Sequence, residues 1–335
     1  MKARSTFSIS IERLKLRHTF TIARGSQDET PVVILSLRSG DHEGFGESSP
    51  SSFYGETVES VVESLERERE FIESADLDHY EHVLEEASER FGHSRAALCA
   101  FDTAVHDLAS RRLGHPLWRL LGLDPARVPV SSFTIGLDST ERMVEKLREA
   151  DRYPVIKIKL GTDRDLEIVR ALREVSQATF RVDANCAWSA EEAIEKSREL
   201  ASLGVEFIEQ PLPPEAIDDM ERVHRESALP VVADENAVVP EDVPKLAGRF
   251  HGINIKLVKC GGLRPARRMV ETARALGLRV MYGCMIESSV LISAAAQIGA
   301  LADWLDLDGN VLITNDPFRG VENRDGRLIL PEGWV

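Results

Sequence analysis

Short apolar runs alternate with amphipathic stretches from residue 128 onward. The runs are rich in β-branched residues, as buried strands are, and the segments between them space their apolar residues as helices do. Eight such runs occur, at residues 128–136, 155–160, 180–185, 206–210, 230–235, 252–257, 279–284 and 304–309. From the second run onward they recur every 22 to 27 residues, about the length of a strand, a helix and two loops. This pattern predicts an α/β fold, a (β/α)8-type barrel, with a doubly wound open sheet as the structural alternative.

The first third of the chain has a different pattern. Residues 7–20 alternate loosely and residues 31–37 form one apolar run, as strands do. Charged residues are then interleaved with apolar ones at helical spacing, which predicts helices over residues 58–75, 80–91 and 94–112. The pattern therefore predicts an α+β domain ahead of the barrel, and we place the boundaries at residues 1–125, 126–312 and, for the tail, 313–335.

Composition and charge exclude several classes of protein. The 335 residues carry a net charge of −15, which is unsuited to binding a phosphate backbone. No apolar stretch has the length of a membrane span, and the first residues lack the apolar run of a signal peptide. The four cysteines are far apart and form no C-x-x-C pair, so we expect neither a disulfide framework nor a zinc site. A cytoplasmic protein that binds a small molecule, and neither nucleic acid nor membrane, is the expectation.

Charged residues gather where the predicted strands end. Asp183, Glu209 and Asp234 follow three successive apolar runs, and a barrel brings the carboxyl ends of its strands together on one face. Charged groups in such positions are costly to bury unless they are paired or bind metal. A set of three carboxylates without His or Cys favours Mg²⁺, with Mn²⁺ as an alternative, over zinc.

Lysines occupy two other strand ends. Lys157 and Lys159 are two residues apart on the second predicted strand, so both point to the same side. We expect two neighbouring ammonium groups, together with a metal ion, to lower each other's pKa and so to provide a base near neutral pH. Lys256 lies on the sixth strand, diametrically opposite in a ring of eight. A substrate held between the strands would have one lysine on each face of its α-carbon.

These motifs resemble the enolase superfamily, within its muconate-lactonizing-enzyme subgroup. The resemblance rests on KIK at 157–159, VDAN at 182–185, IEQP at 208–211, ADE at 233–235 and NIKLVKCGG at 254–262, and it covers nearly the whole chain. It implies a barrel with an α+β capping domain that the C-terminal tail returns to complete. It also implies that Asp183, Glu209 and Asp234 bind the metal. Lys159 and Lys256 would then be the acid/base pair, supported by Lys157.

The eighth predicted strand carries a motif that distinguishes between the activities known in this subgroup. Asp306-Leu307-Asp308 resembles the D-x-D motif that binds the substrate's α-ammonium in dipeptide epimerases. Paired carboxylates on one side of a strand suit the binding of an ammonium group. Alternatively, they could cap a helix or pair with a basic residue. The resemblance implies epimerisation at the C-terminal residue of a dipeptide, by two-lysine proton transfer through a metal-stabilised enediolate. The alternatives are an o-succinylbenzoate synthase, an N-acylamino-acid racemase, and a binding protein on a barrel that has lost its activity.

Two segments match the family's closing loops in position. Residues 21–26 and 48–57 are rich in small residues, as mobile lids are. Arg24 resembles an arginine that could meet an acidic side chain of the substrate's second residue in Ala-Glu epimerases, or it could simply face solvent. Phe53 and Tyr54 could line an apolar subsite or only pin their loop. The sequence leaves open the preferred dipeptide and whether the chain forms a homo-oligomer.

Overall fold

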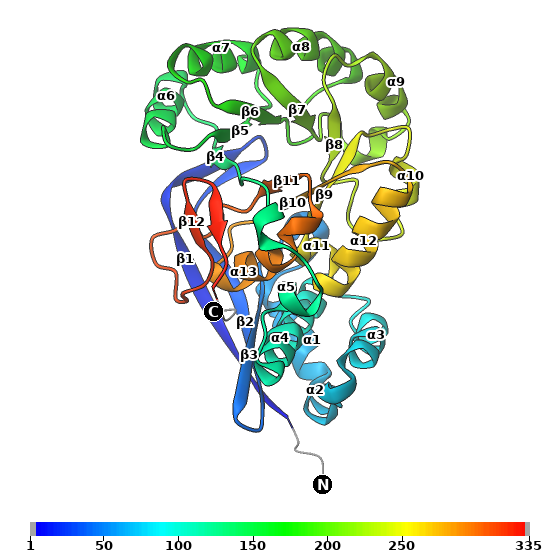
Figure 1. The fold of residues 1–335 in the computed structure, drawn as a ribbon. Helices are drawn as coiled ribbons and strands as arrows, with labels where there is room; N and C mark the ends of the chain where they lie inside the picture. Colours follow the sequence, from blue (N-terminus) through cyan, green and yellow to red (C-terminus); the bar gives the residue numbers. More distant parts are fainter. Residues whose placement is uncertain (1–4, 332–335) are drawn as a thin grey trace.

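The computed structural model describes residues 5–331, which form a three-stranded sheet with helices, an eight-stranded parallel sheet with helices, and a small C-terminal hairpin (Figure 1). The first sheet is antiparallel in the order β1-β2-β3, from β1 (Thr6–Ile22), β2 (Gly25–Ser39) and β3 (His42–Ser48). Its helices follow in the chain: α1 (Val58–Arg67), α2 (Arg69–Ser74), α3 (Tyr80–Arg90), α4 (Arg95–Leu113) and α5 (Leu117–Leu120). The predicted single helix over 58–75 is broken at Glu68, whose backbone leaves the helical region.

Local signals explain where these helices begin and end. Thr57 and Ser60 form a capping box that satisfies the first amide groups of α1. Helix α4 begins after the cap Ser94 and ends at Gly114, whose φ of 68° is the left-handed conformation that glycine adopts without strain. Gly46 of β3 serves packing, because a Cβ there would lie 1.9 Å from the Ala100 carbonyl oxygen of α4. Glycine thus lets β3 and α4 approach closely.

The eight strands of the parallel sheet follow the sequence order from one edge to the other. They are β4 (Phe133–Ile135), β5 (Val155–Lys159), β6 (Thr179–Asp183), β7 (Val205–Glu209), β8 (Val231–Ala233), β9 (Gly252–Lys256), β10 (Arg279–Gly283) and β11 (Trp304–Asp306). The two edges meet, because Ser131 forms a parallel bridge with Leu305 and the Ser132 amide donates to the Leu305 carbonyl oxygen at 3.0 Å. The sheet is therefore a closed barrel, as predicted, and the open doubly wound alternative is excluded.

Helices surround the barrel on the outside (Figure 1). They are α6 (Thr140–Glu149), α7 (Asp165–Val175), α8 (Ala190–Ser202), α9 (Asp219–Glu226), α10 (Val243–Leu246), α11 (Leu257–Cys260), α12 (Leu263–Ala275) and α13 (Ser289–Gln297). Within the described residues β11 is followed by the tail rather than by a helix. None of the helices in the described part of the chain is long and apolar enough to cross a membrane.

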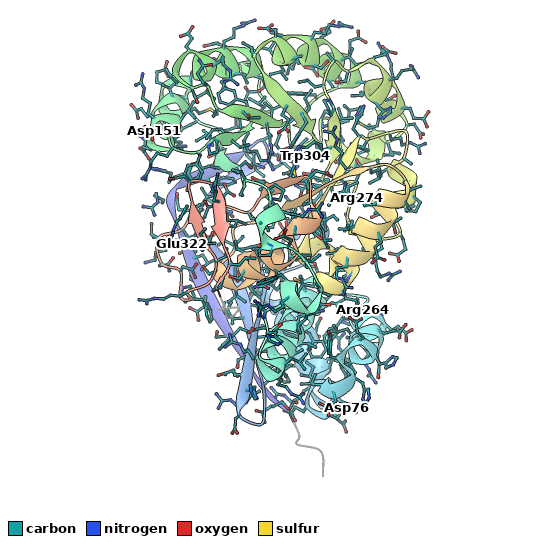
Figure 2. All side chains as sticks on the ribbon, in the orientation of Figure 1. Asp76, Asp151, Arg264, Arg274, Trp304 and Glu322 are labelled. Carbon is teal, nitrogen blue, oxygen red and sulfur yellow. The ribbon has the colours of Figure 1, made fainter. Side chains whose placement is uncertain are left out.

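The interior of the barrel is filled by side chains. Phe207, Val232, Met281 and Trp304 form a buried cluster of their own, and the Phe207 and Trp304 rings lie 4.8 Å apart. Trp304 is labelled within the ring of strands in Figure 2. A filled interior leaves the strand ends and loops as the place for a site.

The tail contacts both parts of the molecule. Thr314 donates its amide hydrogen to the Lys15 carbonyl oxygen of β1 at 2.8 Å. The hairpin of β12 (Glu322–Arg324) and β13 (Arg327–Ile329) lies against the barrel, where the Ser131 amide donates to the Gly326 carbonyl oxygen at 2.8 Å. The tail thus contacts β1 of the first sheet as well as the barrel, and its last four residues lie outside the described part of the chain. The domain boundaries stay a prediction.

Candidate active site

A cavity of about 540 Å³ lies at the carboxyl ends of the barrel strands. Its walls come from the strand ends, from the loop after β10, from the β1–β2 hairpin and from residues 49–54. The predicted site residues that line it are Arg24, Lys159, Asp234, Lys256, Asp306 and Asp308. The two predicted lids therefore face the barrel mouth, although residues 21–26 form a paired β-hairpin turn rather than an open loop.

Three buried carboxylates meet beside this cavity. Asp183 ends β6, Glu209 ends β7 and Asp234 follows β8, and one oxygen of each lies within 4.8 Å of the others. None of the three is more than 2% exposed. Lysine ammonium groups lie against all three carboxylates, and a set of oxygen donors this close together suits a hard ion such as Mg²⁺. The chemistry of these residues thus fits the predicted metal.

Burial and charge act against each other at these carboxylates. Burial raises the pKa of Asp183, but the ammonium groups of Lys159 and Lys157 outweigh it and hold that pKa at about 2. Burial likewise opposes Lys256 and Lys259 at Asp234, and the two lysines hold its pKa well below the usual range. For Glu209, burial and the charge of Asp183 prevail and raise the pKa to about 7. The charge of the cluster is therefore sensitive to any cation bound there.

The lysines lie on opposite sides of the barrel, as the strand order predicts. Lys159 ends β5 and donates to Asp183 at 2.6 Å, whereas Lys256 ends β9 and donates to Asp234 at 2.8 Å. Lys157 points into the barrel on the same side as Lys159 but is not among the residues that line the cavity. Its Nζ atom lies 2.7 Å from carboxylate oxygens of both Glu209 and Asp306.

Among the described side chains, nearby carboxylates raise the pKa of Lys157 and Lys256, whereas the expected lowering, which concerned Lys157 and Lys159 beside a metal ion, stays a prediction. Burial lowers the pKa of Lys157, but Asp306, with Glu209 and Asp183, outweighs burial and raises it well above the ordinary value. At Lys256 burial and the charge of Lys157 both lower the pKa, yet Asp234 raises it overall. The like-charge effect exists, but the carboxylates are closer and more numerous than the sequence alone indicates.

The two aspartates of the D-x-D motif have different surroundings. Asp306 is already bound by other side chains, because it accepts hydrogen bonds from Lys157 and from the Ser132 hydroxyl, both at 2.7 Å. Pairing with a basic residue, which the sequence left open, is therefore present at this position. Asp308 has no cation this close among the described residues: it accepts from the Thr134 amide at 2.6 Å and from the Cys284 thiol at 3.8 Å. Burial and the charge of Asp306 raise the pKa of Asp308 to about 7.

Arg24 reaches across the cavity from the β1–β2 turn. Its guanidinium lies 2.7 Å from a Glu235 carboxylate oxygen and donates to the Asn185 carbonyl oxygen at 3.0 Å. It also stacks on the Phe53 ring, 4.6 Å from the ring centroid. Burial, followed by the charge of Asp234, raises the pKa of Glu235. Arg24 is therefore not the plain solvent-facing side chain that the sequence allowed, and one residue joins both lids to the barrel.

Two functional neighbours were missed from the sequence. Lys259 in α11 is fully buried and donates to Asp234 Oδ1 at 2.5 Å and to the Asp234 carbonyl oxygen at 2.6 Å. Asn254 in β9 donates to Glu209 at 2.7 Å. Both belong to the NIKLVKCGG motif, where the available signals were a polar residue inside a buried strand, Asn254, and a charged residue inside a short buried helix, Lys259. They hold two of the three carboxylates in place.

Sequence comparison shows the family to which the chain belongs. Residues 5–122 match the N-terminal domain of the mandelate racemase and muconate lactonizing enzyme family, and residues 139–333 match its enolase C-terminal domain-like partner. The chain belongs to the enolase superfamily. Two relatives are similar to this chain over most of its length. The L-Ala-D/L-amino acid epimerase of Flavobacterium johnsoniae is 44% identical, over 93% of each chain. The L-Ala-D/L-Glu epimerase of Bacteroides thetaiotaomicron is 42% identical, over 95% of this chain and 83% of its own.

A solved structure of the superfamily has the same fold. The dipeptide epimerase of Methylococcus capsulatus, complexed with Mg and the dipeptide L-Arg-D-Lys, superposes with a TM-score of 0.91 at 32% identity. The match covers 100% of this chain and 98% of that one. The resemblance noted in the sequence motifs is thus confirmed over the whole fold.

Proposed function

We propose that this chain is a Mg²⁺-dependent dipeptide epimerase that inverts the α-carbon of the C-terminal residue. The observation that carries the proposal is the joint presence, around one cavity, of a carboxylate triad, two opposed lysines and a D-x-D pair. The named activities of the relatives agree with it. The substrate of an o-succinylbenzoate synthase has no ammonium group that Asp308 could bind. The substrate of an N-acylamino-acid racemase has none either, because its amino group is acylated.

Asp183, Glu209 and Asp234 would hold the metal ion. When bound, Mg²⁺ would supply a site for the substrate carboxylate and stabilise the negative charge that develops on it as the α-proton leaves. Carboxylates that bind a metal ion attract the neighbouring lysine ammonium groups less strongly. This loss of partner charge would move the lysine pKa values down toward neutrality, as general base catalysis requires.

The other site residues would fix the direction of the dipeptide. With its carboxylate beside β6, β7 and β8 and its ammonium at Asp308 after β11, the substrate spans the barrel mouth. Its α-carbon then lies between β5 and β9, which carry Lys159 and Lys256. Asp306, already bound to Lys157, would contribute mainly through its charge. Arg24 would face the side chain of the C-terminal residue.

The two lysines would exchange one proton. A neutral lysine on one face takes the α-proton, and the ammonium of the other lysine gives a proton to the opposite face. The carbon is thereby inverted, and each lysine has the protonation state that the other had before. Either direction is served, because Lys159 and Lys256 would take the donor and acceptor roles in turn.

The test is deuterium incorporation in D₂O with Mg²⁺ and pooled L,L-dipeptides, followed by mass spectrometry. We expect a subset of dipeptides to gain about one mass unit per inverted α-carbon and a chelator to abolish the gain. No incorporation by the folded, metal-loaded protein would overturn the proposal and direct the search to N-acylamino acids and lyase substrates.

The lysine assignment is tested separately with Lys159→Ala and Lys256→Ala. Each variant is expected to lose epimerisation by at least about a thousandfold, since inversion needs both faces. Each should keep its binding of Mg²⁺, measured by calorimetry, and Lys245→Ala on the outside of the barrel is the matched control. Retained epimerisation in either variant would contradict the two-base scheme without affecting the substrate class.

A further inference from the structure

The Arg24–Glu235 ion pair occupies the part of the cavity that the proposed substrate leaves for its C-terminal side chain. Glu235 directly follows the metal-site residue Asp234, and its side chain is only 1% exposed. A dipeptide bound by its carboxylate at the triad and by its ammonium at Asp308 keeps its C-terminal residue on the triad side of the mouth. The side chain of that residue therefore faces Arg24 and Glu235, which line the same cavity.

The pair changes what Arg24 can offer to a ligand. One guanidinium nitrogen lies 2.7 Å from Glu235 Oε1, and another donates to the Asn185 carbonyl oxygen. The second oxygen of Glu235, Oε2, is buried and accepts no hydrogen bond from the described residues. An incoming side chain thus meets a positive and a negative group together.

We propose that Glu235 determines the charge specificity of this enzyme for the C-terminal residue, by neutralising Arg24 and disfavouring acidic side chains. The inference rests on the proposed dipeptide epimerase function and deepens it. With the pair intact, the charges of Arg24 and Glu235 cancel, and this wall suits uncharged side chains such as an amide. Without the Glu235 charge, the same wall becomes cationic and suits a carboxylate.

Distance makes the effect large. A substrate carboxylate that reaches Arg24 must also approach Glu235, because the two groups are in contact. Two like charges within several ångströms repel strongly in a partly buried site. Phe53 stacks on Arg24 and limits how far its guanidinium can turn away from Glu235. Repulsion by Glu235 therefore offsets much of the attraction by Arg24.

The experiment compares L-Ala-L-Glu with L-Ala-L-Gln, which have nearly the same shape and differ in charge. For each enzyme variant the measured quantity is the ratio of the two kcat/KM values, so that a general loss of metal affinity or stability cancels. Glu235→Gln is expected to raise the ratio in favour of L-Ala-L-Glu by about tenfold or more. Glu241→Gln, which removes an exposed carboxylate later in the same loop, is the matched control and should leave the ratio unchanged.

A second pair of variants keeps the test decisive if Glu235→Gln folds poorly. Arg24→Gln is expected to lower the ratio, and the double variant should return it toward the wild-type value because both charges are gone. A ratio that stays within about twofold in Glu235→Gln, or that falls, would overturn the inference. Wild-type enzyme that labels no dipeptide in D₂O would instead overturn the proposed function itself, so the two failures are distinguishable.

Discussion

At the scale of single residues, the site is organised by unequal sharing of charge. Asp306 ends β11 and Asp308 lies two residues further on, yet Asp306 is bound to Lys157, whereas the side-chain partners of Asp308 among the described residues are the Thr134 amide and the Cys284 thiol. An ammonium that enters the cavity therefore finds its free acceptor at Asp308. In the proposed function, Asp306 of the D-x-D motif would be a structural residue and Asp308 a binding residue.

This difference leads to a prediction for Asp308→Asn. The amide can still accept from Thr134 but carries no charge, so the KM for dipeptides is expected to rise about 10- to 100-fold. Steady-state kinetics measures the effect, and Mg²⁺ binding by calorimetry should be unchanged. The control is Asp303→Asn, an exposed position before β11. An unchanged KM would return the lyase and N-acyl alternatives to consideration.

At the scale of elements, two carboxylates fasten the N-terminal domain to the barrel. Asp102 of α4 accepts from the Leu263 amide at the first residue of α12, at 2.6 Å. Glu47 of β3 accepts from the Ser288 amide and hydroxyl and from the Leu291 amide, at the start of α13. A carboxylate at a helix N-terminus is stabilised by the free amides and the helix dipole. Both helices follow strands that form the cavity wall, so these contacts fix the lids relative to the site.

The Glu47 contact has a pH signature. Burial raises its pKa to about 7, despite the hydrogen bonds from Ser288 and Leu291. Between about pH 4.5 and 7 the folded protein then holds a proton that the unfolded chain has lost, so this group's contribution to stability falls as pH rises. The free energy of unfolding of the wild type, relative to Glu47→Gln, is expected to fall by up to about 3 kcal/mol across that window.

Urea unfolding at pH 5 and pH 8 measures this prediction. Glu43→Gln on the same strand is the control, because Glu43 is partly exposed and pairs with Arg38. The control variant should follow the wild type at both pH values. A difference between wild type and Glu47→Gln that is independent of pH would contradict the assignment of this titration to Glu47.

At the scale of the whole molecule, the proposed metal site joins three strands of the barrel. Asp183, Glu209 and Asp234 end or follow β6, β7 and β8, and the unfolded chain cannot hold their oxygens within 4.8 Å. An ion bound only by the folded state stabilises the whole domain in proportion to its occupancy. The lysines around the triad already supply countercharge, so the ion adds its stabilisation to theirs.

We therefore predict that Mg²⁺ raises the melting temperature and that a chelator lowers it. Saturation at a hundred times the dissociation constant would add about 2.7 kcal/mol, a shift of several degrees for a chain of this size. Differential scanning calorimetry with and without Mg²⁺ measures the shift. Asp183→Asn should show a much smaller response, whereas the exposed Asp219→Asn should respond as the wild type does.

Much of this molecule could be predicted from the sequence because the deciding signals are local. The alternation of strand and helix patterns predicted the barrel, and the strand ends predicted which face would carry Asp183, Glu209, Asp234 and the two lysines. Each of these inferences uses only the period of a strand and the order of strands in a ring. The family motifs added the named chemistry of the relatives.

Only the tertiary structure decided how the charges are paired. Lys157 meets Asp306 across 149 residues of sequence, and Arg24 lies against Glu235 from another domain. Lys259 and Glu47 gain their roles from contacts of the same kind. The interaction of two charges depends on their distance and on the water excluded between them, and neither follows from the spacing of residues along the chain. The sequence thus determined the fold and the composition of the site, whereas the folded structure determined how its charges are paired.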